Sequence, residues 1–318
     1  MAGKKILVVF GATGNQGGSV VRSILSDPKT AAEYTVRAVT RDPSKPAAQE
    51  LAALGAEVVA GDLDDEASLE KVIAGADSVF SVTNFWEKVS AEVEIKQGKN
   101  VADASKKAGV QHLIWSSLLN VTKLSGGKLD KVAHFDSKAE VEEYIRSIGI
   151  PASFFLPGFF MSNLPGKMVR PSPQTGAYTL ALPIPTNSPI PLIDIESDTG
   201  KFVKGILLNR EKVLGQRIYG ATAYVTPTEI INEFKASKPQ DSTGAVAVEI
   251  PGDVFKGFLA KTGAPPHIQE EMLQNMQLIP QFGYYGGASF DESHSILVDP
   301  LTTWKEYIAK TPVWAELK

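Results

Sequence analysis

One stretch near the start of the chain decides its fold: Lys5-Ile6-Leu7-Val8-Val9-Phe10-Gly11-Ala12-Thr13-Gly14-Asn15-Gln16-Gly17. The first part is mainly apolar and reads as a strand, the second part repeats glycine at every third position, and residues 18–26 are patterned as a helix. A strand that ends in glycines and leads into a helix lets the backbone approach a diphosphate, whose charge the free N–H groups of the helix stabilise. We therefore predict a dinucleotide-binding turn at residues 11–17.

A glycine-rich turn has a simpler interpretation, because Gly11 or Gly14 alone can permit a sharp bend without any ligand. The position of this turn favours the binding site, since it directly follows the first strand and opens a helix, which is the context that the motif requires.

The second predicted strand, residues 35–40, is followed by a base, Arg41, rather than by an acid. An acid at this point binds the ribose 2′-hydroxyl of NAD, whereas an arginine pairs with the 2′-phosphate of NADP. We predict a preference for NADP(H), with Arg41 and Lys45 holding the phosphate. The alternative is that both are solvated cations of the loop and that Asp42 binds a ribose hydroxyl.

The composition is that of an ordinary globular protein, with 43% hydrophobic and 21% charged residues in 318. The length exceeds one minimal nucleotide-binding unit and allows a second lobe. No segment approaches the roughly 20 apolar residues of a membrane span, and the amino terminus does not read as a signal peptide. We expect an intracellular protein of the cytoplasm, with the nucleus as an alternative.

The charge and the residue inventory narrow the classes of function. A net charge of −4 without a basic cluster argues against direct binding of nucleic acid. The chain has no cysteine, which excludes disulfides, thiolate zinc sites and cysteine nucleophiles, and its histidines suggest no metal constellation.

Strand-like and helix-like segments alternate through the first half of the chain, which predicts a parallel sheet of about six strands with crossover helices. Prolines and glycines then crowd the sequence after Pro157. We predict an α/β fold: a Rossmann, doubly wound parallel sheet with a smaller α+β C-terminal lobe. Residues 1–157 would form the NADP-binding domain, with returning elements near 192–220, and residues 158–318 the smaller lobe for a substrate or partner.

Several motifs together give the chain a family resemblance. It resembles the atypical, NmrA-like branch of the short-chain dehydrogenase/reductase superfamily, a group of NADP(H)-binding redox sensors and fungal regulators related to isoflavone reductases. The motifs are residues 9–20, which include the glycine turn, Val39-Thr40-Arg41-Asp42-Pro43, Val82-Thr83-Asn84-Phe85-Trp86-Glu87, His134-Phe135-Asp136-Ser137-Lys138 and Glu140-Val141-Glu142-Glu143-Tyr144.

The resemblance implies roles for individual residues. It implies contacts to the diphosphate from Gly11, Ala12, Thr13, Gly14, Asn15, Gln16 and Gly17, to the 2′-phosphate from Arg41 and Lys45, and to the adenine side from Asp62 and Leu63. The nicotinamide half would be lined by Thr83, Asn84 and Phe85, its ribose would be bound by Lys138, and the far wall would be formed by Phe159, Phe160, Met161 and Ser162.

The chain departs from active reductases of the superfamily at one position. Those enzymes carry a Tyr-x-x-x-Lys pair whose tyrosine protonates the substrate carbonyl. Here His134 stands four residues before Lys138. Tyr144 follows Lys138 by six residues, so on a helix with a period of about 3.6 residues it points to another side. His134 can still relay a proton, which leaves Lys138 and His134 as the candidate catalytic pair.

These residues leave two main hypotheses. The one we favour from the sequence is a regulatory protein that senses the NADPH/NADP⁺ ratio and passes it to a protein partner. The alternative is an NADPH-dependent reductase of a hydrophobic or aromatic small molecule that uses Lys138 and His134. A sugar-nucleotide epimerase shares the fold, but such enzymes normally retain the tyrosine. The sequence leaves oligomerisation open.

Overall fold

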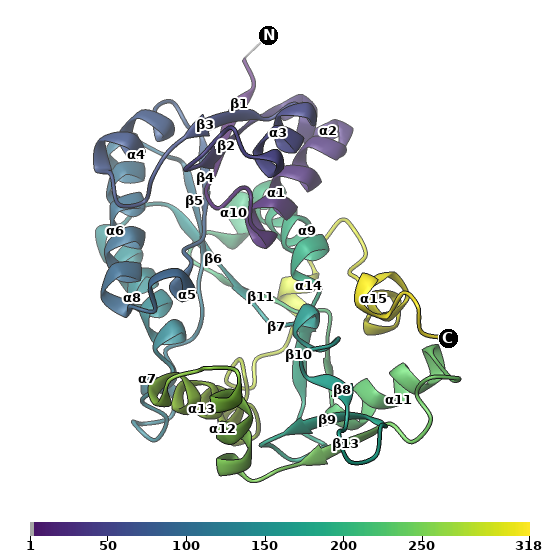
Figure 1. Ribbon diagram of the computed structural model, residues 1–318. Coiled ribbons are helices and arrows are strands. Elements are labelled where there is room, and N and C mark those ends of the chain that lie inside the picture. The colour runs from purple at the N-terminus through teal and green to yellow at the C-terminus, as the bar shows by residue number, and fades with distance from the viewer. Residues whose placement is uncertain (1–2) are drawn as a thin grey trace.

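A computed structural model describes residues 3–318, and its central layer is a sheet of seven parallel strands (Figure 1). The strand order is β11-β6-β5-β4-β1-β2-β3, which contains the 3-2-1-4-5-6 order of the doubly wound nucleotide fold. The predicted fold class is therefore confirmed. The strands are β1 Lys5–Val9, β2 Tyr34–Thr40, β3 Glu57–Ala60, β4 Ser78–Ser81, β5 His112–Ser116, β6 Ala152–Pro157 and β11 Arg217–Gly220.

Helices cover both faces of this sheet (Figure 1). One face carries α4 Glu66–Ile73, α6 Ala91–Lys107 and α8 Ala133–Ile148, and the other carries α1 Asn15–Ser26, α3 Pro46–Ala53 and α9 Ile195–Leu208. Side chains of β1 alternate between two apolar cores, with Leu7 and Val9 in the core beneath α1 and α9 and Val8 in the core beneath α6 and α8. This alternation follows from the two-residue period of a strand that is buried on both faces.

The turn after β1 is too tight for side chains at two of its glycines. Gly11 has φ +63°, a conformation that L-residues other than glycine rarely adopt. A Cβ on Gly17 would lie 2.3 Å from the carbonyl oxygen of Gly11, so the first turn of α1 packs directly on the loop backbone. Glycine at these positions therefore fixes the direction in which α1 leaves the sheet.

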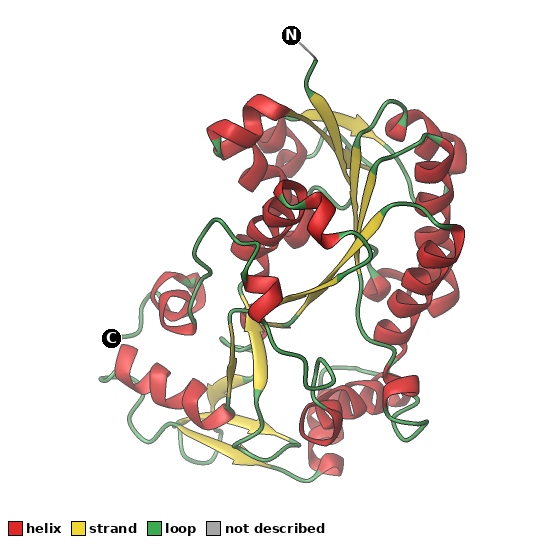
Figure 2. Ribbon diagram, turned by 180° about the vertical axis from the view of Figure 1, so that it is seen from behind, coloured by secondary structure: helices red, strands yellow, loops and turns green. Residues whose placement is uncertain are grey.

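The smaller lobe contains two three-stranded sheets (Figure 2). One has the order β12-β10-β7 and the other β13-β9-β8. Their strands are β7 Phe159–Phe160, β8 Val169–Pro171, β9 Tyr178–Leu182, β10 Ile190–Ile193, β12 Ala223–Val225 and β13 Val246–Glu249. Its main helices are α11 Pro227–Ser237, α12 Gly252–Lys261, α13 Pro266–Phe282 and α15 Trp304–Lys310.

Short helical elements complete the chain. They are α2 Pro28–Glu33, α5 Phe85–Lys88, α7 Val121–Leu124, α10 Arg210–Val213, α14 Asp291–His294 and the 3₁₀ turns Met161–Asn163 and Pro312–Trp314. No helix within residues 3–318 is both long enough and apolar enough to cross a membrane.

The segment expected to return to the first lobe does so through two elements. Helix α9 packs along α1, and β11 pairs in parallel with β6 at the edge of the main sheet. The sheet therefore has one strand more than the six expected. The boundary between the lobes at residue 157 stays a prediction.

The contact between α1 and α9 allows a test of how closely the two helices approach. A Cβ on Gly200 would lie 2.2 Å from the Ser19 carbonyl oxygen, so Gly200→Ala must push the helices apart. We expect it to lower the free energy of unfolding by about 2 kcal/mol, measured by urea denaturation. Gly257→Ala is the matched control, because Gly257 is an exposed helical glycine with no atom within 4 Å of its Cβ position. Gly257→Ala should raise the free energy of unfolding slightly. Equal losses of unfolding free energy in the two variants would contradict close packing at Gly200.

Candidate functional site

The first turn of α1 leaves its backbone N–H groups without a side-chain cap. Gly14 is the N-cap residue and its backbone is extended, whereas α2, α4, α6 and α9 begin with a capping aspartate or serine. An uncapped helix start beside a tight glycine turn suits an anionic ligand. Gln16 lies in this turn, and its side-chain oxygen accepts a 2.8 Å hydrogen bond from Ser116 at the end of β5.

The cations predicted to hold a 2′-phosphate are exposed and lie beyond β2. Arg41 donates through Nη1 to Oε1 of Glu87 on α5 at 2.5 Å, and 64% of its side chain is exposed. Lys45 is the residue before α3 and is also exposed. Any phosphate that binds Arg41 must therefore compete with the Glu87 carboxylate.

The predicted adenine-side residues lie in the loop after β3. The Asp62 side chain accepts from the backbone N–H of Asp64 at 3.0 Å, and the Leu63 carbonyl accepts from Asn100 at 3.0 Å. Asp65 caps α4, as expected for a helix start. These bonds hold the loop in place but leave the adenine role of Asp62 and Leu63 a prediction.

A cavity of about 1270 Å³ opens between the sheet and the smaller lobe. Its walls include Trp86 and Tyr284, and aromatic side chains of both lobes are prominent among them. The cavity brings together residues far apart in the sequence. Of the predicted site residues, those that line it are Gln16, Thr83, Asn84, Phe85, His134, Lys138, Phe159 and Phe160.

Lys138 forms a buried ion pair that the sequence analysis did not foresee. Its ammonium contacts the carboxylate of Glu94, a residue of α6 that is 2% exposed. The same carboxylate accepts from Thr83 Oγ1 at 2.7 Å and from the Ser137 hydroxyl. Burial lowers the pKa of Lys138, and the charge of Glu94 acts in the opposite direction. The lysine is therefore held by a fixed anionic partner at the cavity wall.

His134 also has a partner that sequence reasoning missed. Its Nδ1 lies 2.6 Å from Oε1 of Glu271 on α13, and the ring centroid lies 4.9 Å from that of Trp86. An ionised carboxylate can only accept, so Nδ1 carries the proton and Nε2 has no partner within residues 3–318. This arrangement leaves one imidazole nitrogen available to a ligand in the cavity that the ring lines.

No tyrosine takes the place of the missing one. Tyr144 donates to Asp103 at 2.7 Å on an exposed surface away from the cavity. Tyr284 does line the cavity, but burial raises its pKa well above the usual range, which makes it a poor proton donor near neutrality. Tyr285 donates to the Leu156 carbonyl at 2.9 Å and does not line the cavity. His134 is the side chain that lines the cavity at the position of the missing tyrosine, four residues before Lys138.

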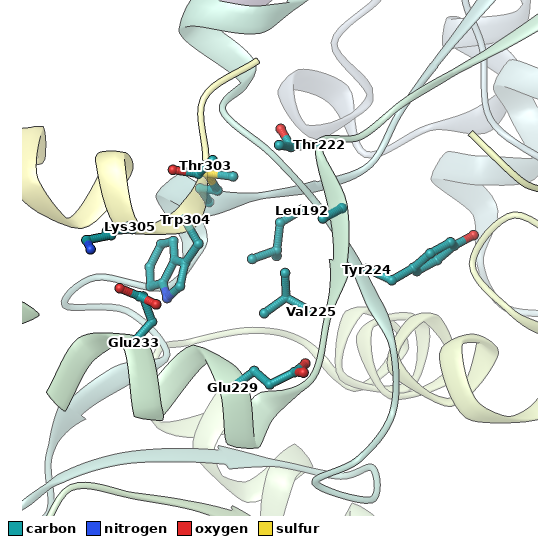
Figure 3. A pocket seen from close by; sticks show the side chains of 11 residues that line it. Leu192, Thr222, Tyr224, Val225, Glu229, Glu233, Thr303, Trp304 and Lys305 are labelled. Carbon is teal, nitrogen blue, oxygen red and sulfur yellow. The ribbon is translucent and has the colours of Figure 1, made fainter. Parts of the chain in front are cut away.

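Met161 and Ser162 were predicted on the far wall together with Phe159 and Phe160, but they are placed differently. Met161 lines a second, smaller cavity of about 370 Å³ whose walls include Leu192, Tyr224 and Trp304 (Figure 3). Ser162 lines neither cavity. Of residues 159–162, only Phe159 and Phe160 therefore line the large cavity.

Glu94 did leave a signal in the sequence. It shares the buried face of α6 with Gly98 and Val101, four and seven residues later, so an acid occupies an otherwise apolar helical stripe. Glu271 of α13 is buried too, but Gln274 and Asn275 share its helix face, so it left a weaker signal than Glu94. An acid in such a position predicts a buried partner, although the sequence does not say which cation it meets.

Comparison with known proteins gives a consistent assignment. The model of the NmrA-like family matches residues 3–308. An NmrA-like family domain-containing oxidoreductase of Malbranchea aurantiaca, malD, is 34% identical over 73% of this chain and 72% of its own. An NmrA-like family domain-containing protein of Dictyostelium discoideum is 30% identical over 96% of this chain and 97% of its own.

A solved structure shares the fold over nearly the whole chain. NmrA, a negative transcriptional regulator crystallised with NADP, aligns with a TM-score of 0.80 and 23% identity, covering 97% of this chain and 95% of that one.

The buried ion pair predicts a large effect from a small change. Glu94→Gln leaves the Lys138 ammonium buried without its counter-charge, so we expect a loss of roughly 3 kcal/mol in the free energy of unfolding, measured by urea denaturation. Adding Lys138→Met should recover part of it. Glu92→Gln, on the exposed side of the same helix, is the control and should change stability by less than about 0.5 kcal/mol. Similar losses of unfolding free energy in Glu94→Gln and Glu92→Gln would contradict the role given to the ion pair of Glu94 and Lys138.

Proposed function

The chain belongs to the NmrA-like family, and from this premise we propose that it binds NADP(H) and uses it to reduce an aromatic or otherwise hydrophobic small molecule. The cavity carries this proposal, because it extends from Gln16 in the glycine turn past Lys138 to the aromatic walls of the smaller lobe. A cofactor and an apolar substrate would then meet in one enclosed space.

The residues of the chain suit the cofactor in three places. The uncapped N–H groups at the start of α1 suit the diphosphate, Arg41 suits a 2′-phosphate, and Lys138 suits the hydroxyls of the nicotinamide ribose. NADPH, when bound, supplies the hydride. The preference for NADP(H) over NAD(H) rests on Arg41, since no acid occupies the end of β2.

His134 is the side chain that we assign to proton transfer. The bond from its Nδ1 to Glu271 orients the ring, and a protonated imidazole can donate a proton from Nε2 to the oxygen of a substrate carbonyl whose carbon accepts the hydride. Lys138 would position the nicotinamide half and lend positive charge, with Glu94 keeping its ammonium in one place. Aromatic side chains surround His134, with Trp86 among them, and give this end of the cavity an apolar lining.

A second candidate is a redox sensor that reports the state of the NADP(H) pool to a protein partner. The replacement of the usual tyrosine by His134 and the pairing of Lys138 with Glu94 support it, since both weaken the ordinary reductase machinery. The ion pair between Arg41 and Glu87 supplies a mechanism. A bound 2′-phosphate would pair with Arg41 in place of Glu87. Helix α5, which carries Glu87, would then be released from the end of β2, and its Trp86, which is 45% exposed, would be available to a protein partner.

The cofactor preference is tested by calorimetry with NADPH, NADP⁺ and NADH. We expect NADPH to bind more tightly than NADH, and Arg41→Ala to weaken NADPH binding by roughly tenfold to a hundredfold, because a charge-assisted contact to phosphate is lost. NADH affinity should change little. Lys235→Ala, which removes an exposed cation from α11 in the other lobe, is the control. A uniform loss for both nucleotides would count against a phosphate contact at Arg41.

Turnover separates the two candidate functions. The NADPH complex is followed at the absorbance of the reduced nicotinamide while aromatic ketones, enones and quinones are added. A reductase should consume NADPH, Lys138→Met should abolish turnover, and His134→Gln should lower kcat by about 10²–10⁴-fold. Tight NADPH binding with no consumption across the panel would reject the reductase and favour the sensor.

A further inference from the structure

We propose that the ligand of the large cavity is an aromatic molecule that carries a carboxylate or a similar anionic group. Three cations, Lys167, Arg170 and Lys261, would act as its counter-charges at the exposed edge of the cavity. The inference rests on the proposed function in so far as it assigns the cavity to a small-molecule ligand, and it holds for a substrate and for a regulatory ligand alike.

The charged side chains that line the cavity are cations. Within residues 3–318, lysine and arginine line it at four positions and no aspartate or glutamate does, although the chain has more acids than bases overall. Lys138 has its partner in Glu94 behind the wall. The other three cations form neither an ion pair nor a side-chain hydrogen bond with any residue in the range 3–318. An acid-free wall of this kind attracts an anion and repels a cation.

Two acids of α13, the helix that packs against α12, are paired with other residues. Glu270 on α13 binds Lys256 of α12 at 3.0 Å, and Glu271 binds His134. Lys256 belongs to the same helix as Lys261 but does not line the cavity. These two carboxylates therefore do not pair with the cations at the edge of the cavity.

Two of the cations converge on one aromatic ring. The guanidinium carbon of Arg170, on β8, lies 5.6 Å from the centroid of Phe258, and the Lys261 ammonium, on α12, lies 6.0 Å from it. Like charges gathered at one ring from two separate elements repel each other, and an anion between them would relieve this repulsion. Phe258 lines the cavity as well, so a bound aromatic ring could pack beside it.

Asn275 provides an independent sign of a ligand with acceptor oxygens. It is 6% exposed, lines the cavity, and its amide nitrogen has no hydrogen-bond partner among residues 3–318. An unsatisfied buried donor is costly, and a ligand oxygen in the cavity would satisfy it once the amide turns toward the cavity, because the nitrogen itself is shielded. Asn275 follows Glu271 by one helical turn of α13, so this donor belongs to the same wall as the His134 pair.

The apolar part of the wall defines the rest of the ligand. Aromatic side chains line the cavity from the sheet side and from the smaller lobe, namely Phe85, Trp86, Phe135, Phe159, Phe160, Phe255, Phe258 and Tyr284. A volume of about 1270 Å³ accommodates more than a nicotinamide ring alone. An aromatic body with an acidic group thus matches both the apolar surface and the charge.

The test measures binding to the protein of residues 1–318 saturated with NADP⁺, so that it does not depend on turnover. Calorimetry compares the carboxylates 2-naphthoate, biphenyl-4-carboxylate and anthracene-9-carboxylate with their neutral carboxamides. We expect each carboxylate to bind at least about tenfold more tightly, and the preference to shrink as salt is raised. Equal affinities, or no binding by any of the carboxylates, would overturn the proposal.

Variants identify the groups responsible. Arg170→Gln combined with Lys261→Gln should remove most of the carboxylate preference, whereas Lys256→Gln, with the same change in charge per site on α12, should leave it intact. Asn275→Leu should weaken carboxylate and carboxamide alike. A double variant that keeps the full preference would assign the anion to another place and overturn the inference.

The outcomes separate this inference from the proposed function. Carboxylate-selective binding without any NADPH consumption would reject the reductase while upholding the anionic ligand. Reduction of neutral aromatics without carboxylate preference would uphold the reductase and overturn the anionic ligand.

Discussion

The close backbone contact between Gly11 and Gly17 is the constraint on which the rest of the molecule depends. Because no side chain fits there, α1 starts directly against the turn and leaves the sheet in one direction. That direction lays Ser19 and Ser23 against Gly200, where α9 crosses α1 with equally little space. Helix α9 in turn brings the chain back to the main sheet, where β11 pairs with β6. The position of the smaller lobe over the strand ends thus follows from a turn near the amino terminus.

The site is built from pairs of charged residues whose members come from different elements. Glu94 on α6 holds Lys138 of α8, and Glu271 on α13 holds His134 at the start of α8. A buried carboxylate is tolerable only with such a partner, so each pair fixes both side chains and the helices that carry them. Helix α8 is therefore bound to the main lobe through Lys138 and to the smaller lobe through His134, four residues earlier. Both of these residues line the cavity.

Charged residues around the cavity follow one pattern. Glu94, Glu271 and Glu270 are paired with Lys138, His134 and Lys256, and within residues 3–318 no carboxylate lines the cavity wall. Arg41 is paired with Glu87, and Glu87 is one residue from Trp86 of the cavity wall. If Arg41 binds a 2′-phosphate as proposed, that phosphate and a ligand in the cavity would both act on one short helix, α5, whichever of the two proposed functions holds.

The sequence by itself determined the turn at residues 11–17 and the doubly wound parallel sheet with its crossover helices, because turn chemistry and side-chain periodicity are local. It also identified Lys138, His134 and Phe85 as neighbours of one site through family motifs. Only the tertiary structure showed β10, which contains Pro191, and the partners Glu94 and Glu271. His134 and Glu271 are 137 residues apart, and such a pairing depends on how two lobes pack, which no local pattern encodes.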